Sequence, residues 1–318
     1  IALNGKATII DTASLKVNFL GTTFKFANED IVLKKKSIEF YKGGLFDKTI
    51  TVMDEFNNKG TLRAKLEHNS FKDFSVQASI ITDKFNFLNT TYKDNKDFFG
   101  KVYASGVVDI NGPVNNINMN ITAETLPNTE FNIVVAGSGG DQIFDFVQFT
   151  DRSIPRDSTK NVDKAQKSAP SNLTLEMNIN ATPDAQLKMY LDYVKNDVIK
   201  ARGNGELQLK IDPNGMQMIG EYVATSGEYL FSQQEIVNKK FNIKNGSTIN
   251  WDGDLLNAKM NVNAVYSARV SMSDVVDSTS NLANKRYPVD VVLNIGGTLA
   301  ETDIKFSLAP PDGQSSIP

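Results

Sequence analysis

Few residues in this chain have the types and spacing that catalysis requires. His68 is the only histidine, so a Ser-His-Asp triad or a histidine metal site would have to include it. It ends the alternating apolar row formed by Leu62, Ala64 and Leu66. That position favours a role at a strand end or in a turn over a role in catalysis.

Two other segments could serve chemistry, and a turn explains each of them better. Asp252 and Asp254 flank Gly253 and could hold a cation or act as an acid and base pair. No further ligands lie at loop spacing, which favours a hairpin turn. The segment GSGGD at 137–141 is glycine-rich like a phosphate loop but lacks the Lys-Ser or Lys-Thr ending. A flexible turn is predicted there.

Composition excludes several further classes of function. The chain has no cysteine, which removes thiol catalysis, thiolate metal sites and disulfides. Its 34 basic and 37 acidic residues nearly cancel, so no strongly basic surface points to nucleic acid. No apolar run reaches the roughly 18–20 residues that a bilayer-spanning helix needs. We therefore predict a protein that is not an enzyme, uses no cofactor or metal and binds no nucleic acid.

Apolar and polar residues alternate along most of the chain. Leu207, Leu209 and Ile211, for example, alternate with Gln208 and Lys210. A period of two places one row of side chains on each face of a sheet, so one face is apolar and the other polar. No stretch shows helical periodicity with an apolar stripe. The sequence therefore predicts an all-β fold in which the apolar face is the working surface.

One polar segment interrupts this pattern. Residues 151–171 are rich in Pro, Ser, Lys and Asp, the composition of a flexible linker, so we predict β-structure over 1–150 and again over 172–318. The segment 220–266 is predicted to form short strands separated by turns at Gly and Asn. Further turn signals predict antiparallel hairpins between neighbouring strands. They lie at Asn4-Gly5, Asn111-Gly112-Pro113, Asn204-Gly205, Pro213-Asn214-Gly215 and Asn245-Gly246.

The segment 220–266 carries several motifs in a fixed order. They are GEYVATSGEYLF (220–231), KFNI (240–243), GSTINWDGD (246–254) and an Ala-x-Tyr ending at Tyr266. This order resembles the C-terminal signature of the TamB family. Upstream, LEHNSFKDF (66–74) and NTTYKDNKDFFGKVYASGVVDINGPV (89–114) resemble members of that family from the Bacteroidota branch, so the likeness covers most of the chain. The chain departs from the family pattern at Leu255, where a proline is usual, and at Asn196, where a glycine is common.

The resemblance implies an elongated β-sheet curled into an open, taco-shaped groove with an apolar interior, as in AsmA-like bridges. It also implies an inner-membrane anchor N-terminal to this chain, a periplasmic location that reaches the outer membrane, and an outer-membrane partner of the Omp85 barrel type, like TamA. Phospholipid is the implied transported ligand. The residues expected to line the groove are Leu173, Leu175, Met177, Ile179, Leu187, Met189, Leu191, Leu207, Leu209, Ile211, Met218, Tyr222, Phe241, Ile243, Ile249, Trp251, Met260, Val262, Ala264, Tyr266, Val289, Val291, Leu293 and Ile295.

Three functions remain open from the sequence. The first is a lipid conduit, in which the aliphatic lining shields acyl chains from water. The second is an assembly factor for outer-membrane proteins, in which an open sheet edge exchanges strands by β-augmentation. The third is a closed β-solenoid or sandwich, in which the alternating residues form an ordinary packed core. The aliphatic lining favours the conduit over the other two.

Overall fold

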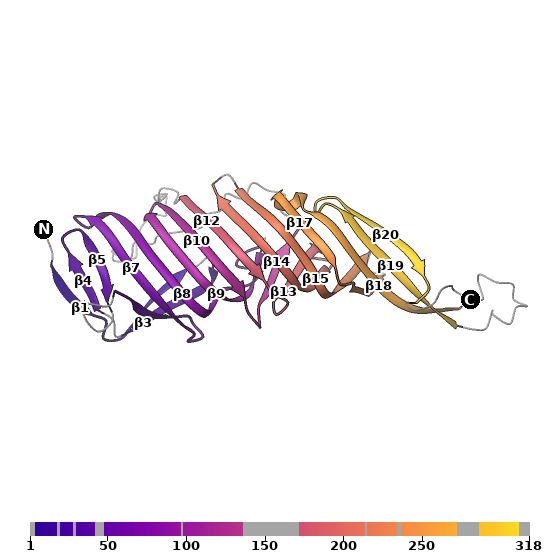
Figure 1. Ribbon diagram of the computed structural model, residues 1–318, viewed down its shortest axis with the longest axis horizontal. Coiled ribbons are helices and arrows are strands. Elements are labelled where there is room, and N and C mark those ends of the chain that lie inside the picture. Colours follow the sequence, from indigo (N-terminus) through magenta and orange to yellow (C-terminus); the bar gives the residue numbers. More distant parts are fainter. Residues whose placement is uncertain are drawn as a thin grey trace, which may run out of the picture.

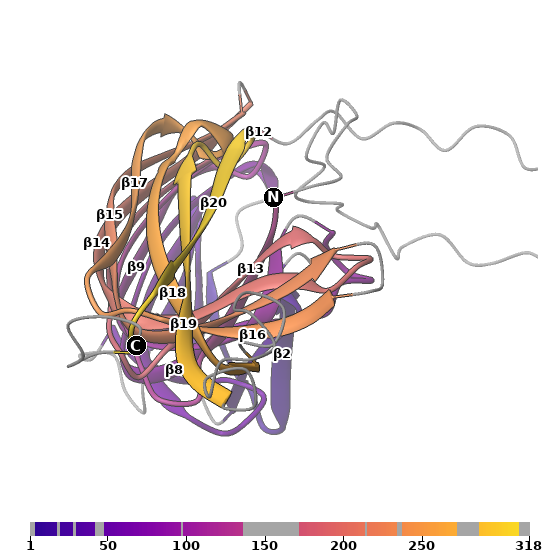
Figure 2. The same cartoon turned by 90° about the vertical axis from the view of Figure 1, so that its right-hand side faces the viewer.

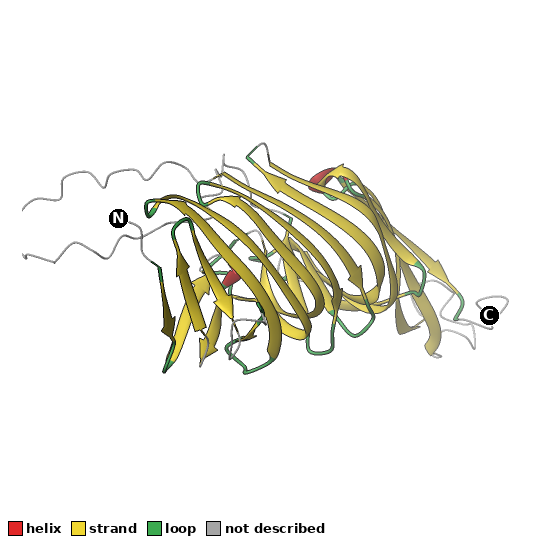
Figure 3. Cartoon of the chain, turned by 60° about the vertical axis from the view of Figure 1, so that its left-hand side comes forward, coloured by secondary structure: helices red, strands yellow, loops and turns green. Residues whose placement is uncertain are grey.

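The structure, a computed structural model, describes residues 4–17, 20–27, 30–41, 48–96, 98–135, 172–213, 215–233, 237–271 and 286–311. These residues form one curled β-sheet, and no α-helix occurs among them. Figure 1 shows the strands crossing an elongated body obliquely, with the first strands at one end and the last at the other. Strands also dominate the view in Figure 3. The predicted all-β class and the curled sheet are confirmed.

The described residues form eleven strands before residue 135 and nine after residue 171. In the first half they are β1 (Gly5–Thr8), β2 (Thr12–Val17), β3 (Thr22–Ala27), β4 (Asp30–Lys34), β5 (Ser37–Tyr41), β6 (Ile50–Met53), β7 (Lys59–Asn69), β8 (Lys72–Thr90), β9 (Phe98–Pro113), β10 (Asn116–Thr125) and β11 (Glu130–Val134). In the second half they are β12 (Asn172–Ala181), β13 (Gln186–Asp192), β14 (Asp197–Asp212), β15 (Gly215–Gln233), β16 (Val237–Ile243), β17 (Ser247–Asp254), β18 (Lys259–Ser271), β19 (Arg286–Gly297) and β20 (Thr302–Ala309). A 3-10 turn, η2 (Leu255–Asn257), follows β17.

Long strands bend half-way, and each half pairs with a different short strand. β14 pairs with β12 through residues 205–211 and with β13 through 197–201. β15 pairs with β17 through 217–224 and with β16 through 227–233, and β9 divides in the same way between β10 and β11. We call the side with β10, β12 and β17 the major wall, the side with β11, β13 and β16 the minor wall, and the bend between them the fold line. Figure 2 shows this curl from the end of the body.

A bulge and close backbone contacts produce the bend. The register of β14 against β15 shifts after Arg202, so that Thr225 is an additional residue on β15. Such a bulge bends the strand and increases its twist. Next to it, a Cβ added to Gly203 would lie 2.1 Å from the carbonyl oxygen of Val223. On β9, a Cβ at Gly106 would lie 2.1 Å from the carbonyl oxygen of Thr122. Only glycine lets the backbones approach this closely.

Hydroxyl groups hold the corners where one wall passes into the other. Thr129 Oγ1, before β11, accepts a hydrogen bond from the Tyr103 amide at 3.0 Å and donates to the Tyr103 carbonyl at 2.9 Å. Ser247 Oγ, at the start of β17, accepts from the Asn263 amide at 3.1 Å and donates to the Asn263 carbonyl at 3.2 Å. Each hydroxyl therefore pairs backbone groups that the bend removes from the regular ladder.

Several predicted turns are wrong. Asn204 and Gly205 lie inside β14, whereas residues 111–113 end β9 directly before the turn at 114–115, which joins it to β10 in the predicted antiparallel hairpin. Gly220 and Gly227 do not separate short strands, because both belong to the 19-residue strand β15. These glycines serve close packing of neighbouring backbones within bent strands. The turn predicted at Asn245-Gly246 is confirmed between β16 and β17, whereas Asn214 lies outside the described residues.

The two halves of the chain meet through parallel pairs. β10 pairs with β12, and β11 pairs with β13, in parallel. Parallel pairing was not foreseen from the hairpin signals. It joins residues before 135 to residues after 172 in one hydrogen-bonded sheet, and the proposed linker at 151–171 lies outside the described residues, as does the glycine-rich segment at 137–141. The division into two segments stays a prediction.

Candidate functional site in the interior of the sheet

The inner face of the curled sheet buries apolar side chains in two clusters. The N-terminal cluster consists of Phe24, Val52, Ile80, Phe85 and Val108, with further side chains packed against it. The C-terminal cluster is larger and contains side chains from both walls of residues 172–311. Inward side chains of alternating strands from both halves of the chain form these clusters, which are therefore the candidate site.

Most residues expected to line a groove are buried on this inner face. Gln208 and Lys210, which flank Leu209 in the sequence, are exposed. Of the expected residues, those buried in the C-terminal cluster are Met189, Leu207, Met218, Tyr222, Phe241, Ile243, Ile249, Trp251, Met260, Val262, Ala264, Leu293 and Ile295, and those half-buried against it are Ile179, Leu187, Leu191, Leu209, Tyr266 and Val291. Leu173, Leu175, Met177, Ile211 and Val289 are not part of the cluster. The contact of any of them with a ligand stays a prediction.

The sequence analysis missed important members of the C-terminal cluster. Tyr229 is fully buried in it, and Phe231 packs against it. On β15, the inward residues before the bulge are Tyr222 and Ala224, which have even numbers, whereas those after it have odd numbers. The additional residue Thr225 reverses the parity of the strand. Only knowledge of the bulge would have placed Tyr229 and Phe231 inside.

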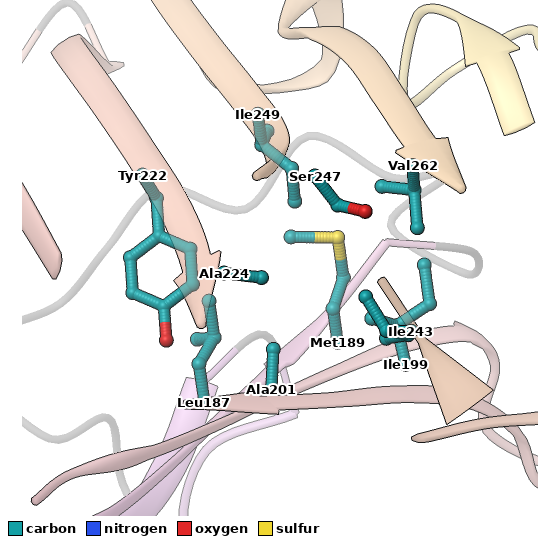
Figure 4. A pocket seen from close by; sticks show the side chains of 10 residues that line it. All are labelled: Leu187, Met189, Ile199, Ala201, Tyr222, Ala224, Ile243, Ser247, Ile249 and Val262. Atoms are coloured by element: carbon teal, nitrogen blue, oxygen red, sulfur yellow. The ribbon is translucent and has the colours of Figure 1, made fainter. Parts of the chain in front are cut away.

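The C-terminal interior is closely packed. A small cavity lies between the walls, lined by Leu187, Met189, Ile199, Ala201, Tyr222, Ala224, Ile243, Ser247, Ile249 and Val262 (Figure 4). It offers about 10 Å³ to a sphere of the size of water, which is close to the minimum for one water molecule. Small side chains at Ala201 and Ala224 leave this space, and the flexible thioether of Met189 lies beside it. An acyl chain would have to displace side chains to enter.

Three buried polar atoms in the cluster have no hydrogen-bond partner among the described residues. They are the hydroxyl oxygens of Tyr222 and Tyr229 and the indole nitrogen of Trp251. Burial raises the pKa of Tyr222 and of Tyr229, so both hydroxyls keep their protons. The Asp197 carboxyl interacts with the Tyr229 hydroxyl, and burial raises the pKa of Asp197 as well. The interior thus contains uncharged donors in an apolar setting.

Aromatic rings bring β20 against β15 and β16 near the C-terminal end. Phe306 on β20 lies with its ring centroid 5.6 Å from that of Phe231 on β15 and 6.2 Å from that of Phe241 on β16. Tyr266 on β18 also contacts Phe241, at 5.8 Å. Edge-to-face contacts of this kind stabilise packing beyond the area that they bury. Side chains therefore join β20 to two strands with which it has no described backbone pairing.

The other candidate residues have structural roles. His68 Nδ1 accepts a hydrogen bond from the Phe71 amide at 3.3 Å, and the two rings stack, which confirms the turn role. Asp254 caps η2 through the Leu256 amide at 2.7 Å, so the turn expected at 252–254 begins only after β17 ends. Within the described ranges, no three His, Cys, Asp or Glu side chains are placed to hold a metal ion. No helix in that part of the chain is long and apolar enough to cross a membrane.

Comparison with known proteins decides the family. The family model of the TamB C-terminal domain matches residues 48–317, which is 270 of the 318 residues. The chain belongs to the TamB family. No curated protein matches the chain. The resemblance seen in the motifs at 220–266 is thereby confirmed, whereas the kinship with the Bacteroidota branch stays a prediction.

Membership places the chain in a family that acts in the translocation and assembly module. TamB proteins span the periplasm of the cell envelope and work with an outer-membrane partner. The matched region begins at β6 and includes the fold line, both walls and the whole C-terminal cluster. The C-terminal interior is therefore a feature of the TamB domain itself.

Proposed function

We propose that this TamB chain is part of a periplasm-spanning bridge whose apolar interior conducts phospholipid between the inner and outer membranes. One observation carries the proposal, an unbroken row of inward apolar side chains that crosses both halves of the sheet. Each member lies directly opposite the next on the neighbouring strand. The row, called here the apolar row, consists of Ile50, Leu62, Ile80, Val108, Ile121, Met177, Leu209 and Met218.

The apolar row follows the direction in which cargo would travel. Neighbouring strands lie about 4.8 Å apart, so eight strands extend it over about 34 Å. It passes from β10 to β12 through Ile121 and Met177, where the two halves of the chain meet. Ile121, Met177 and Leu209 are only half-buried, so apolar surface is accessible in the middle of the row. A hydrocarbon chain could cover this surface, which would otherwise contact water.

The way in which the walls are joined allows the interior to open. In the described part of residues 172–311, the backbone ladder runs within each wall and along the long bent strands, and no ladder joins the walls across the interior. Side-chain contacts alone close the space. Separating the walls would therefore expose the lining without breaking the sheet, and Met189 and Met218 can adapt their shape to a ligand.

Photo-crosslinking tests the conduit. A photoreactive residue at Leu209 or Val262 should capture phospholipid, and the same residue at Lys210 or Asn261 should not, because the latter face outward. Leu209→Asp should remain folded by circular dichroism, since its half-buried position lets water reach the carboxylate, and its lipid capture should fall. A folded variant with unchanged capture would refute the assignment of this face. An unfolded one would indicate a closed core.

A free sheet edge supports the alternative function, assembly of outer-membrane proteins by β-augmentation. Among the described strands, β20 pairs with β19 alone, and its side chains Phe306 and Leu308 are 51% and 70% exposed. Exposed, unpaired edges accept an additional strand. A cysteine at Lys305 should then crosslink to an Omp85-type barrel partner more readily than one at Lys16. Equal crosslinking from both positions would contradict this orientation.

A further inference from the structure

Two hydrogen-bond donors on neighbouring strands of the C-terminal interior lack an acceptor. The hydroxyl of Tyr222 on β15 and Nε1 of Trp251 on β17 form no hydrogen bond with any residue that the structure describes, although the side chains are only 4% and 2% exposed. Leaving such a group buried and unpaired costs about 1–3 kcal/mol. Phenylalanine would fill the position of Tyr222 without this cost. The two donors therefore point to an acceptor outside the described part of the chain.

The two donors belong to neighbouring strands of the major wall. Trp251 lies opposite Gly220, and Tyr222 lies opposite Ile249, so the two side chains are diagonal neighbours on the inner face. Figure 4 shows the Tyr222 ring beside the cavity, extending toward Leu187 on the minor wall. The hydroxyl of Ser247, which also lines the cavity, already bonds to backbone carbonyls. Of the two lining residues with a hydroxyl, Tyr222 is therefore the one whose donor is unpaired.

The surroundings determine the chemistry of the acceptor. The side chains around the cavity are apolar apart from Tyr222 and Ser247, and none of them is charged. A phosphate or carboxylate would lose its hydration without gaining a cation, which costs far more than burying a neutral acceptor. A carbonyl oxygen at the head of an apolar chain fits both the donors and the lining. Tyr229 is set apart, because its hydroxyl interacts with Asp197.

We propose that the Tyr222 hydroxyl and Trp251 Nε1 donate hydrogen bonds to the ester carbonyl oxygens of an acyl lipid whose chains lie between the two walls. This assignment rests on the proposed lipid conduit. It adds a specificity that an apolar lining alone does not have, since it distinguishes acyl esters from hydrocarbon chains without carbonyls. It also places the glycerol-ester region of the lipid beside β15 and β17.

A pair of lipids that differ only in the carbonyls tests the assignment. Dipalmitoyl-phosphatidylglycerol and its dihexadecyl diether share the headgroup and chain length, but only the first has ester carbonyls. Binding of each to the purified chain is measured by native mass spectrometry. The wild type should prefer the ester by about fivefold or more, and Tyr222→Phe should remove most of this preference. Tyr222→Phe should fold at least as well as the wild type, because it removes an unpaired hydroxyl.

Controls separate the two proposals. Tyr103→Phe alters a buried tyrosine that packs against Phe56 and lysine side chains outside both clusters, and it should keep the full preference. Trp251→Phe removes the second donor and should also lower the preference for the ester lipid. Equal binding of ester and ether lipid to the wild type, or an unchanged ratio in Tyr222→Phe, would overturn this assignment alone. Binding of neither lipid to the wild type would overturn the conduit itself.

Discussion

The N-terminal and C-terminal interiors are built by the same device and are filled differently. In both, a long strand bends at the fold line and a hydroxyl holds the corner, through Thr129 in one region and Ser247 in the other. The C-terminal interior contains large aromatic side chains, and Leu293 and Tyr229 are fully buried there. The N-terminal cluster is smaller, and Met119 and Ile121 beside it remain half-buried.

This difference shows that the backbone and the side chains control separate properties. Curvature comes from bulges, glycines and corner hydroxyls, which the two regions share. Closure comes from the size of the inward side chains, which the two regions do not share. A TamB sheet can therefore be curled along its whole length while its interior is closed in one part and more accessible in another.

An inward carboxylate should separate the two regions most strongly. Leu293→Asp places a charge in the closed interior and should cost about 4 kcal/mol or more of unfolding free energy, enough to unfold a marginally stable domain. Met119→Asp lies at a half-buried position, where water reaches the carboxylate, and should cost less than about 2 kcal/mol. Urea unfolding followed by circular dichroism measures both. Similar losses in the two variants would show that the interiors do not differ in closure.

Adding a methyl group at the fold line should affect the two regions equally. Gly203→Ala and Gly106→Ala each force a Cβ to within 2.1 Å of a carbonyl oxygen on the neighbouring strand. We expect each to lower stability by about 1–3 kcal/mol through backbone displacement. Gly5→Ala is the control, because nothing lies within 4 Å of its added Cβ. Thermal unfolding of the three variants tests this, and a neutral Gly203→Ala would contradict the role given to the bend.

Removing a corner hydroxyl should have a smaller effect, again similar in both regions. Thr129→Val leaves the Tyr103 amide without its hydroxyl acceptor, and Ser247→Ala does the same to the Asn263 amide, while both carbonyls keep a backbone donor. Each should cost about 1–3 kcal/mol. Thr61→Val, at an exposed position, should change stability by no more than about 0.5 kcal/mol. If the corner variants match this control in chemical denaturation, the hydroxyls do not hold the bend.

The smallest effect concerns pH and has opposite signs in the two regions. The Glu39 carboxylate accepts hydrogen bonds from Lys34 Nζ at 2.8 Å and Tyr41 Oη at 2.6 Å. The Lys34 ammonium, followed by the Tyr41 hydroxyl, lowers its pKa from 4.5 to about 2. Its contribution to stability is therefore present above pH 4.5 and is lost as the pH falls through about 2. In Glu39→Gln, the decline of unfolding free energy over this interval should be shallower.

Asp197 in the C-terminal region behaves in the opposite way. Burial raises its pKa above the ordinary 3.8, so its stabilising contribution is present below pH 3.8 and is lost as the pH rises through the raised value. Asp197→Asn should remove this pH dependence. Urea titrations of both variants between pH 7 and the acid limit of the folded state measure the slopes. If the slope of unfolding free energy against pH changed in the same direction in both variants, the opposite roles given to Glu39 and Asp197 would be contradicted.

The sequence was sufficient for the fold class and for much of the candidate site. Successive Cβ atoms of a strand point to opposite faces, so the row Leu207, Leu209 and Ile211 could be placed on one face without any knowledge of its partners. The same argument placed Met260, Val262 and Ala264 on the inner face. The turn role of His68 also followed from its position at the end of an alternating row.

Properties that depend on a neighbouring strand could not be predicted in this way. A glycine in a turn and a glycine at a close backbone contact have the same sequence signal, so Gly205 and Gly220 were assigned to turns although they lie inside β14 and β15. The bulge at Thr225 arises from the pairing with β14, and it alone turns Tyr229 and Phe231 inward.

The sequence by itself therefore determined the strand pattern and the face that each residue shares with its neighbours, because these follow from local backbone geometry. Only the tertiary structure decided where the strands bend, that β10 and β12 pair in parallel across more than forty residues of chain, and how far the walls close. Those features arise from contacts between residues far apart in the sequence, such as Phe306 with Phe231, and no periodicity along a single strand encodes them.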